Sequence, residues 1–401
     1  MNYRITAELL SPLMIAQNRQ SNASEAVPYL PGSSLRGAIA AKYLREAGNQ
    51  DSADFQKIFV DHPISFPNLL PTLEKERIVP KPLPLTAASC KRYSGFCHSE
   101  REAHAERESH GVLDILAEKV LEAYYPQWLT PSVCPICNND TKPFIGFWND
   151  VLDQPERYKP SIVYQKHTGI DRTSGTVAQE VFYMTQAIAD YALEDKQYKK
   201  QYFSGLIHLT QQEYDILLPL LESSVFVGAD RTRGMGEMTL TLTDCQLPMP
   251  DIESWNESFK GKLTTRLENH IDSTALNSLL EGSFFTINLD ADAILVDSFL
   301  RPTAQPDLCF ESIPKSDIRS VLKVARSKTI RGWNSAWGLP KADDLAVSMG
   351  SVYLFKYDGN NVQQFKQELN QLMSAGIGLR KSEGFGRISI CDNFHLIKEV
   401  I

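Results

Sequence analysis

The stretch GADRTRGMG at residues 228–236 has a second copy, GLRKSEGFG, at residues 378–386. Both copies fit the pattern G-x-x-[RK]-x-x-G-x-G. Glycine adopts positive φ angles at no steric cost and lets another backbone come close, so the repeated pattern indicates a repeated backbone shape. The matched positions are Gly228 with Gly378, Arg231 with Lys381, Gly234 with Gly384, and Gly236 with Gly386. Two copies of one loop predict two copies of the unit that carries it.

The elements around the two loops also repeat. In each half an apolar strand pattern is followed by a helical pattern, the glycine loop and a closing strand. The segments are 202–210, 211–222 and EMTLTLTDC in the first half, and SVYLFKYD, VQQFKQELNQLMSA and RISICDNF in the second. This order predicts an α+β fold with two βαββαβ units of the split-βαβ kind.

The length of 401 residues agrees with two units, because it exceeds what one ordinary core needs. We predict a first domain over residues 1–248 and a second over 281–401, joined by a linker over 249–280. Residues 86–150 hold two cysteine pairs, a highly charged segment and a helical pattern. They are predicted to form an insertion within the first domain.

The composition limits the possible partners. A formal net charge of −8 and a pI near 5.6 argue against a protein that coats nucleic acid through bulk charge. No apolar run approaches the ~18–20 residues of a membrane span, so no membrane partner is expected. The N-terminal MNYRITAELL has neither a basic leader nor an apolar signal core, which predicts a cytoplasmic location.

Basic residues gather at the glycine loops of this acidic chain. Arg231 and Arg233 lie in the first loop, Arg380 and Lys381 in the second, and Arg387 follows the second. Glycine amides and arginine side chains together can bind an anion, although glycines are also what a purely structural turn needs. The loops lack GK[ST] and follow a helix, the reverse of a phosphate-binding loop. A polymer backbone is therefore a better candidate ligand than a nucleotide cofactor.

The paired cysteines in the insertion predict a structural zinc site. Four thiolates satisfy tetrahedral Zn²⁺ and leave no open position. The predicted ligands are Cys90, Cys97, Cys134 and Cys137, and His98, His104 or His110 could replace one of them. The alternative is four unrelated reduced thiols.

Two further segments carry candidate nucleic-acid contacts. Residues 161–189 predict a long hairpin with Lys166, His167 and Arg172 near its tip, which is either a wedge for nucleic acid or an ordinary solvated turn. In KTIRGWNSAW, residues 328–337, Trp333 could stack on a base beside Arg331. The four-residue spacing to Trp337 equally suits a buried pair on a helix, and we expect one tryptophan in the core.

Three motifs of the chain resemble the RAMP superfamily, the RNA-binding subunits of CRISPR effector complexes. They are PYLPGSSLRGAIA at 28–40, where Ser33 or Ser34 is expected to cap a helix, HTGIDRTSGTV at 167–177, and GLRKSEGFGR at 378–387. With the zinc-like insertion and the segment GWNSAWGLP, the chain looks most similar to the large two-unit RAMP subunit of type III-D complexes.

The resemblance implies tandem ferredoxin-like, RRM-like RAMP domains that hold CRISPR RNA, with the hairpin as a thumb-like element. It also implies target RNA and other subunits of the complex as partners, and a position near the 5′ handle of the guide. Together with the residue patterns it gives these predicted RNA-binding residues: Arg36, Lys166, His167, Arg172, Gly228, Arg231, Arg233, Gly234, Gly236, Arg331, Trp333, Arg380, Lys381, Gly384, Gly386 and Arg387.

Catalysis is not expected. Target-cutting RAMP subunits usually carry an aspartate before the PGSSL motif, and residues 11–30 contain none. Guide-processing members often place a histidine near the first helix, whereas the first histidine here is His62, beyond that helix. The alternative is an endoribonuclease that uses His167 or Asp171.

Overall fold

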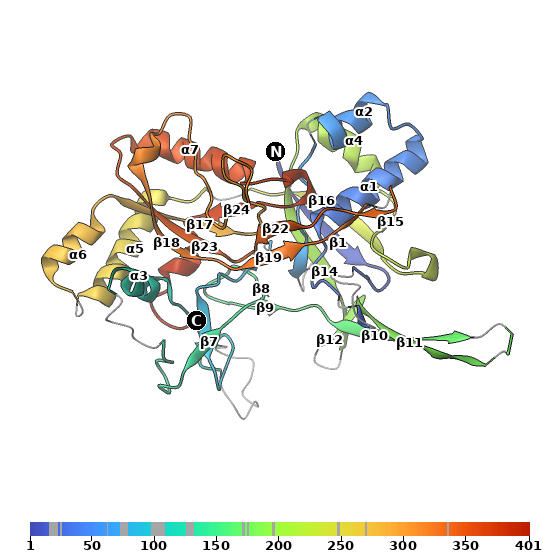
Figure 1. Cartoon of the computed structure of the whole chain (residues 1–401), viewed down its shortest axis with the longest axis horizontal. Helices are drawn as coiled ribbons and strands as arrows, with labels where there is room; N and C mark the ends of the chain where they lie inside the picture. The colour runs from blue at the N-terminus through green and yellow to red at the C-terminus, as the bar shows by residue number, and fades with distance from the viewer. Residues whose placement is uncertain are drawn as a thin grey trace.

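The chain builds two antiparallel sheets that lie side by side (Figure 1). The computed structural model describes residues 1–15, 23–24, 26–61, 63–72, 79–97, 109–125, 132–170, 173–174, 176–194, 197–246, 249–268, 271–334 and 337–401. The predicted mixture of helices and strands is confirmed. No helix in these ranges is both long and apolar enough to cross a membrane.

The first sheet has the strand order β15-β16-β1-β14-β3. Its strands are β1 (Asn2–Leu9), β3 (Leu70–Thr72), β14 (Tyr202–His208), β15 (Val225–Phe226) and β16 (Glu237–Asp244). Alternate residues of β1 are buried on one face, from Tyr3 to Leu9, as a half-buried strand requires. Helices α1 (Gly32–Ala47), α2 (Ala53–Gln56) and α4 (Gln211–Leu221) lie together over this sheet (Figure 1).

The second sheet has the order β18-β23-β17-β24. Its strands are β17 (Ser283–Leu289), β18 (Ile318–Val324), β23 (Val352–Tyr357) and β24 (Ile388–Ile390). All six residues of β23 are buried, because helices cover both faces. Helix α7 (Val362–Ala375) lies on one side, and α3 (Leu116–Tyr124), α5 (Ile252–Leu267) and α6 (Ser273–Leu280) lie on the other (Figure 1).

The two sheets share one topology. Apart from the two-residue edge strand β15 of the first sheet, the first and third strands in chain order pair at the centre of each sheet, the second lies outside the third, and the last lies outside the first. Each unit also inserts a hairpin between its second and third strands. These are β10 (Ile162–Ile170) with β11 (Val177–Ile188) in the first unit, and β19 (Ser327–Ile330) with β22 (Asp344–Val347) in the second.

The units differ in one helix. The first unit has α1 between its first two strands, whereas residues 290–314, all of them described, contain no helix, and only a 3-10 turn at Lys315–Asp317 precedes β18. Helices from elsewhere cover the face of the second sheet opposite α7: α3 comes from the insertion, and α5 and α6 come from residues 249–280.

The insertion packs beneath the second unit. Its small sheets have the orders β6-β5-β7 and β4-β8-β9, and Trp148 makes an edge-on contact with Phe394 near the C-terminus. Val112 and Ile401 exchange two backbone hydrogen bonds, so the last residue of the chain pairs with the insertion.

The remaining strands are β2 (Ala23–Ser24), β4 (Lys81–Pro82), β5 (Ala87–Cys90), β6 (Val112–Asp114), β7 (Thr141–Pro143), β8 (Phe147–Trp148), β9 (Arg157–Tyr158), β12 (Tyr191–Glu194), β13 (Gln197–Lys200), β20 (Trp333–Asn334) and β21 (Leu339–Pro340).

A buried ionic network joins the insertion to the second unit. The Lys262 Nζ donates to Asp114 Oδ2 (2.7 Å) and to the His395 carbonyl oxygen (3.0 Å). The His395 ring lies 3.3 Å from Asp114 Oδ1 and 2.9 Å from the Asn288 side chain. Burial alone raises the pKa of Asp114, but the Lys262 ammonium and His395 outweigh it and hold that pKa well below its usual range.

Candidate nucleic-acid interface and metal centre

The first glycine loop is a rigid turn anchored to the segment after β1. The Ala229 N–H donates to the Met14 carbonyl (2.9 Å), and the Gly236 N–H donates to the Pro12 carbonyl (2.8 Å). Between these anchors, Arg231–Arg233 form a single 3-10 turn.

The second glycine loop repeats this arrangement bond for bond. The Leu379 N–H donates to the Ile294 carbonyl (2.9 Å), and the Gly386 N–H donates to the Asp292 carbonyl (2.8 Å). Its 3-10 turn is Lys381–Glu383. The two loops that the sequence matched by spacing are therefore matched by their hydrogen bonds.

Close backbone approach explains the last glycine of each loop. Gly236 has φ +79°, and a Cβ there would overlap the Val227 carbonyl oxygen. Gly386 has φ +70°, and its Cβ would overlap the Ile377 carbonyl oxygen. The turn geometry thus accounts for these glycines whether or not a ligand binds.

The basic side chains of the two loops have different surroundings. Arg231 and Arg233 are exposed, and Arg233 Nη1 lies 3.7 Å from Asp230 Oδ2. In the second loop Lys381 is exposed, whereas Arg380 is held in two ion pairs. They join Nη1 to Asp344 Oδ2 (2.6 Å) and Nη2 to Glu383 Oε2 (2.7 Å).

Two other predicted RNA-binding arginines donate hydrogen bonds to backbone carbonyl oxygens of the protein itself. The Arg36 Nη2 donates to the Phe59 carbonyl oxygen (2.6 Å) within the first unit. The Arg387 Nη1 donates to the Leu206 carbonyl oxygen of β14, across the boundary between the units. Burial lowers the pKa of Arg387.

In the first unit the glycine loop packs against the base of the protruding hairpin. Met235 is buried with Met14 and Ala187, and Ala229 and Val163 pack against them. Higher on β10, Lys166 is exposed, and His167 Nε2 lies 2.9 Å from Thr185 Oγ1. Arg172 and Asp171 lie outside the described residues.

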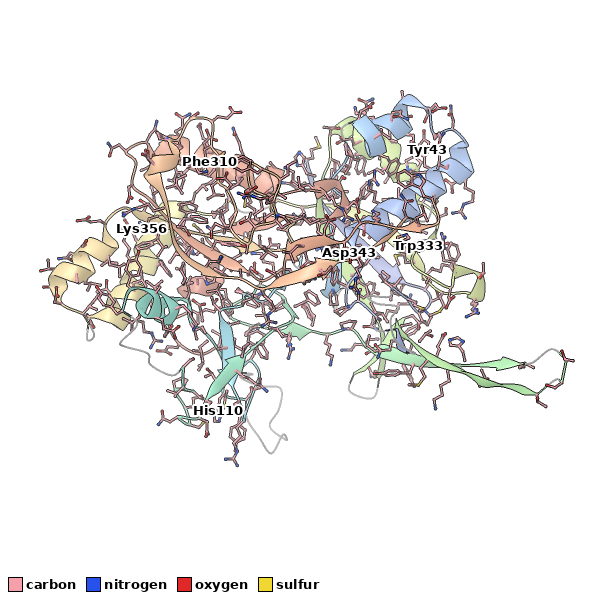
Figure 2. The ribbon with its side chains drawn as sticks, in the orientation of Figure 1. Tyr43, His110, Phe310, Trp333, Asp343 and Lys356 are labelled. Carbon is pink, nitrogen blue, oxygen red and sulfur yellow. The ribbon has the colours of Figure 1, made fainter. Side chains whose placement is uncertain are left out.

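In the second unit ion pairs tie the glycine loop to the second hairpin. Lys341 Nζ lies 2.7 Å from Glu383 Oε2, and Arg380 of the loop pairs with Asp344 at the start of β22. Within the hairpin, Arg331 Nε lies 3.3 Å from Asp343 Oδ2. Trp333, which is labelled in Figure 2, is 56% exposed. Trp337 is 78% exposed. The expectation that one of them is buried is wrong, because they belong to a β20–β21 hairpin and not to a helix.

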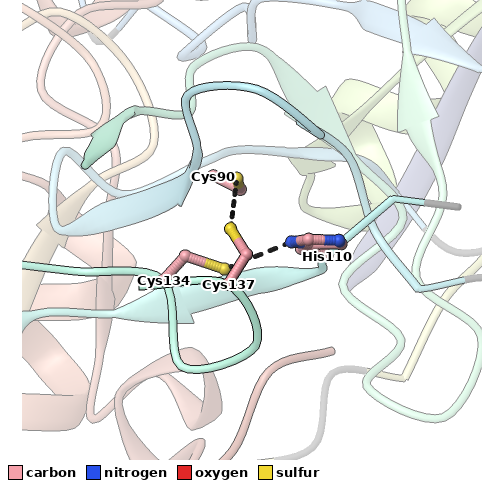
Figure 3. A group of neighbouring side chains, drawn as sticks. All are labelled: Cys90, His110, Cys134 and Cys137. Atoms are coloured by element: carbon pink, nitrogen blue, oxygen red, sulfur yellow. Dashed lines mark hydrogen bonds between the residues drawn. The ribbon is translucent and has the colours of Figure 1, made fainter. Parts of the chain in front are cut away.

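Four side chains in the insertion form a candidate metal centre (Figure 3): Cys90, His110, Cys134 and Cys137. Their ligand atoms all lie within 4.8 Å of one another. Cys90 Sγ is 3.6 Å from Cys137 Sγ, and Cys134 Sγ is 3.4 Å from His110 Nδ1. Two ligands of a tetrahedral Zn²⁺ with bonds of about 2.0–2.3 Å lie roughly 3.3–3.8 Å apart, so the donor set fits that ion.

Strand register brings these ligands together. Ser89 pairs with Val112, so the end of β5 at Cys90 meets the residues just before β6, where His110 lies. Cys90 itself pairs with Thr141 of β7, and the Cys134–Cys137 turn precedes that strand.

The fourth member of the cluster is His110, whereas the sequence predicted Cys97. Residues 91–97 leave β5 in a turn, and the Cys97 thiol is directed to the Ser109 carbonyl oxygen (3.9 Å). His98 and His104 lie outside the described residues. Of the three histidines that the sequence offered as alternatives, His110 is the one among the described residues, and the β5–β6 pairing brings it to the cysteines.

Hydrogen bonds support the candidate ligands. The Asn139 side chain donates to Cys137 Sγ (3.1 Å), and the backbone and side-chain N–H groups of Asn139 lower the pKa of Cys137 to about 6. Burial raises the pKa of Cys134. The Tyr93 ring stacks at 4.5 Å against the imidazole of His110 and helps to orient it.

The N-terminus of α1 differs from its prediction. Pro31 precedes the helix and makes no side-chain cap, so neither Ser33 nor Ser34 caps it. The Gly32 N–H instead donates to Asn68 Oδ1 (2.8 Å). This contact lies 36 residues away in sequence and has no local signal.

Solved structures of CRISPR complexes are similar to this chain at low identity. One chain of the type III-B Cmr-beta complex bound to cognate target RNA has 12% identity and a TM-score of 0.44, with 96% of both chains covered. A chain of the Csm3–Csm4 subcomplex of the type III-A interference complex has 13% identity and a TM-score of 0.33, covering 90% of this chain and 94% of that one. At these scores the similarity supports no statement on function. No curated protein matches the chain.

A family profile matches the N-terminal part of the chain. Residues 6–86, which include the second half of β1, all of α1 and the PGSSLRG motif, match the RAMP superfamily. Over this segment the resemblance carried by the PYLPGSSLRGAIA motif is confirmed, and residues 6–86 are similar to the RAMP superfamily.

Proposed function

We propose that the protein is a non-catalytic RNA-binding subunit of a type III CRISPR ribonucleoprotein in the cytoplasm. The observation that carries this proposal is a chain similar to the RAMP superfamily over residues 6–86, in which a rigid loop presents exposed Arg231 and Arg233 beside a protruding hairpin. In this proposal the chain holds CRISPR RNA near its 5′ handle, and its partners are target RNA and the other subunits of a complex of the type III-D kind.

The fold supports this proposal. The common strand order favours tandem ferredoxin-like, RRM-like units, and we propose residues 1–248 as the first and 281–401 as the second. The zinc-binding insertion over 86–150 and the helices over 249–280 then both buttress the second sheet.

The charge distribution favours a local RNA contact. The chain carries a net charge of −8, so an RNA backbone is repelled by most of its surface and attracted only where cations cluster. The first loop is the better of the two loop candidates, because Arg380 in the second is neutralised by Asp344 and Glu383.

We expect Arg231→Ala with Arg233→Ala to weaken the binding of CRISPR RNA. Loss of two phosphate contacts should also lower the slope of log K against log salt by about 1.4 for single-stranded RNA. Filter binding or fluorescence anisotropy at several salt concentrations measures both quantities.

A matched control removes the same charge elsewhere. Arg45→Ala with Arg301→Ala changes two exposed arginines outside the loops and should leave the slope unchanged. An equal loss of slope in both double variants would mean that only overall charge matters, and an unchanged slope in the loop variant would refute the proposed contact.

We further propose that Cys90, His110, Cys134 and Cys137 hold one structural Zn²⁺. The ion would cross-link the end of β5 to the segments that precede β6 and β7, and with four protein ligands it would leave no open position for catalysis. Its role would be to fix the insertion that packs under the second unit.

The ligand set can be tested by elemental analysis. The purified protein should carry about one zinc per chain. Cys97→Ser should keep it, whereas His110→Ala should lose most of it and lower the thermal midpoint. Retention of zinc in His110→Ala together with its loss in Cys97→Ser would favour the four-cysteine set.

A further inference from the structure

The second glycine loop is docked onto the first unit. The Phe66 N–H donates to the Ser382 carbonyl (3.4 Å), and the Ser65 hydroxyl donates to the Lys381 carbonyl (2.8 Å). A Cβ added at Gly384 would meet the Phe66 carbonyl oxygen at 2.8 Å and the Gly32 Cα at 3.1 Å. The carbonyl side of the 3-10 turn therefore faces the first unit.

The surface that receives this loop is the start of α1. Gly32 is its first residue, and a Cβ there would overlap the Phe66 carbonyl oxygen and lie 3.0 Å from both the Glu383 carbonyl oxygen and the Gly384 Cα. Helix N-termini carry unpaired N–H groups and partial positive charge, so they suit the carbonyl-rich end of a 3-10 turn. The glycine of the PGSSLRG motif is thus explained by its close contacts with Phe66 of the first unit and with the second glycine loop.

The first glycine loop has the same backbone and carries no such cover. Arg231, Thr232, Arg233 and Gly234 are all exposed. A Cβ added at Gly234 would meet no atom within 4 Å, whereas the equivalent Gly384 is in close contact with three. One docking surface is filled within the chain, and its copy is open.

A second copy of the chain cannot fill the open surface in the same way. The start of α1 is already covered by the chain's own loop at Gly384. The second unit offers no equivalent, because the described residues 290–314 between its first two strands contain no helix. The protein that covers the first glycine loop must therefore be a different one, whose first helix begins like α1 but has an uncovered N-terminus.

We infer that the first glycine loop docks, through the backbone of residues 231–234, onto the glycine-containing N-terminus of the first helix of another RAMP-fold subunit. The chain would then have one open docking surface of this kind and no free receiving surface, so it would end a head-to-tail array. This inference rests on the proposed function, since it requires an assembly of like-folded subunits. It assigns the loop backbone to a protein and leaves the Arg231 and Arg233 side chains for RNA.

Site-specific cross-linking tests the contact. A benzoylphenylalanine is placed at Thr232 of the full chain, which is co-expressed with its guide RNA and the RAMP-fold proteins encoded beside it. The expected cross-link joins Thr232 to the residues that begin the first helix of one such protein. A cross-link to RNA, to another protein surface, or to no partner would overturn the inference.

A glycine variant provides the second test. Gly234→Asn keeps the left-handed backbone, which Asn tolerates, and adds a side chain into open space, so the chain should fold. It should weaken association with the neighbouring subunit about tenfold or more, because the side chain occupies the docking surface. Unchanged association, measured by native mass spectrometry titration, would overturn the inference.

The controls separate this inference from the RNA proposal. Gly48→Asn changes another left-handed glycine with open space around it, at the far end of α1, and should leave association intact. The RNA affinity of the isolated Gly234→Asn chain is measured in parallel, and an equal loss of RNA affinity and of subunit association would overturn the inference. Loss of subunit association alone supports docking, whereas absence of RNA binding in the unmodified chain counts against the proposed function and leaves the cross-link result to be judged separately.

Discussion

Replacing Asp114 with alanine is expected to lower the free energy of unfolding by about 3–5 kcal/mol. Lys262 Nζ is 2.7 Å from Asp114 Oδ2, and the two side chains are 2% and 0% exposed. The variant would leave an ammonium buried without its counter-charge, at the junction of the insertion, α5 and the C-terminal residues. Urea denaturation measures the difference.

Two variants give the controls for Asp114. Asp307→Asn removes an exposed carboxylate that pairs with Lys315 and should cost at most about 1 kcal/mol. Asp114→Leu combined with Lys262→Met removes both charges and should recover most of the loss. A small effect of Asp114→Ala would mean that Lys262 finds water or another partner.

The same carboxylate gives a pH dependence of stability. Because the pKa of Asp114 is held well below its usual range in the folded protein, its stabilisation is present above the unfolded pKa near ~3.9 and is lost as the pH falls further. The difference in stability between the unmodified protein and Asp114→Asn should therefore narrow as the pH falls below about 4.

Gly32→Ala is expected to destabilise the protein by about 1–3 kcal/mol, the usual range for overpacking. The added Cβ would overlap the Phe66 carbonyl oxygen and press on the Gly384 backbone. These are backbone atoms, so neither can rotate away, and the start of α1 must shift against residue 66 and against the second glycine loop. Urea denaturation together with hydrogen exchange at residues 380–386 would report both the loss and its location.

Gly37→Ala is the matched control in the same helix. Gly37 is exposed, has an ordinary helical backbone, and would place its Cβ in open space. Alanine there should stabilise the protein by about 0.5–1 kcal/mol, because glycine loses more conformational freedom in a helix. Equal effects of the two substitutions would mean that the close contact at Gly32 carries no cost.

The sequence alone predicted the repeated features of this protein. The glycine loops were matched from spacing, and the structure gives them the same hydrogen bonds, because positive φ angles and close backbone approach at Gly236 and Gly386 select glycine locally. The mixed α and β order followed from periodicity, and the PGSSLRG motif indicated the superfamily that the profile match over residues 6–86 supports.

Several assignments needed contacts between distant residues. Spacing could not choose between Cys97 and His110, because the choice depends on the register of β5 with β6. Spacing also suggested a buried tryptophan on a helix where a hairpin exposes both Trp333 and Trp337.

By itself, the sequence determined which segments repeat, because local backbone chemistry is encoded residue by residue. Only the tertiary structure decided how the copies are used. The second loop is covered by Gly32 and Phe66, which lie more than 300 residues earlier in the chain, and the first loop is open. A docking contact depends on shape and distance between units, and the residues that form it carry no periodic pattern that a sequence can display.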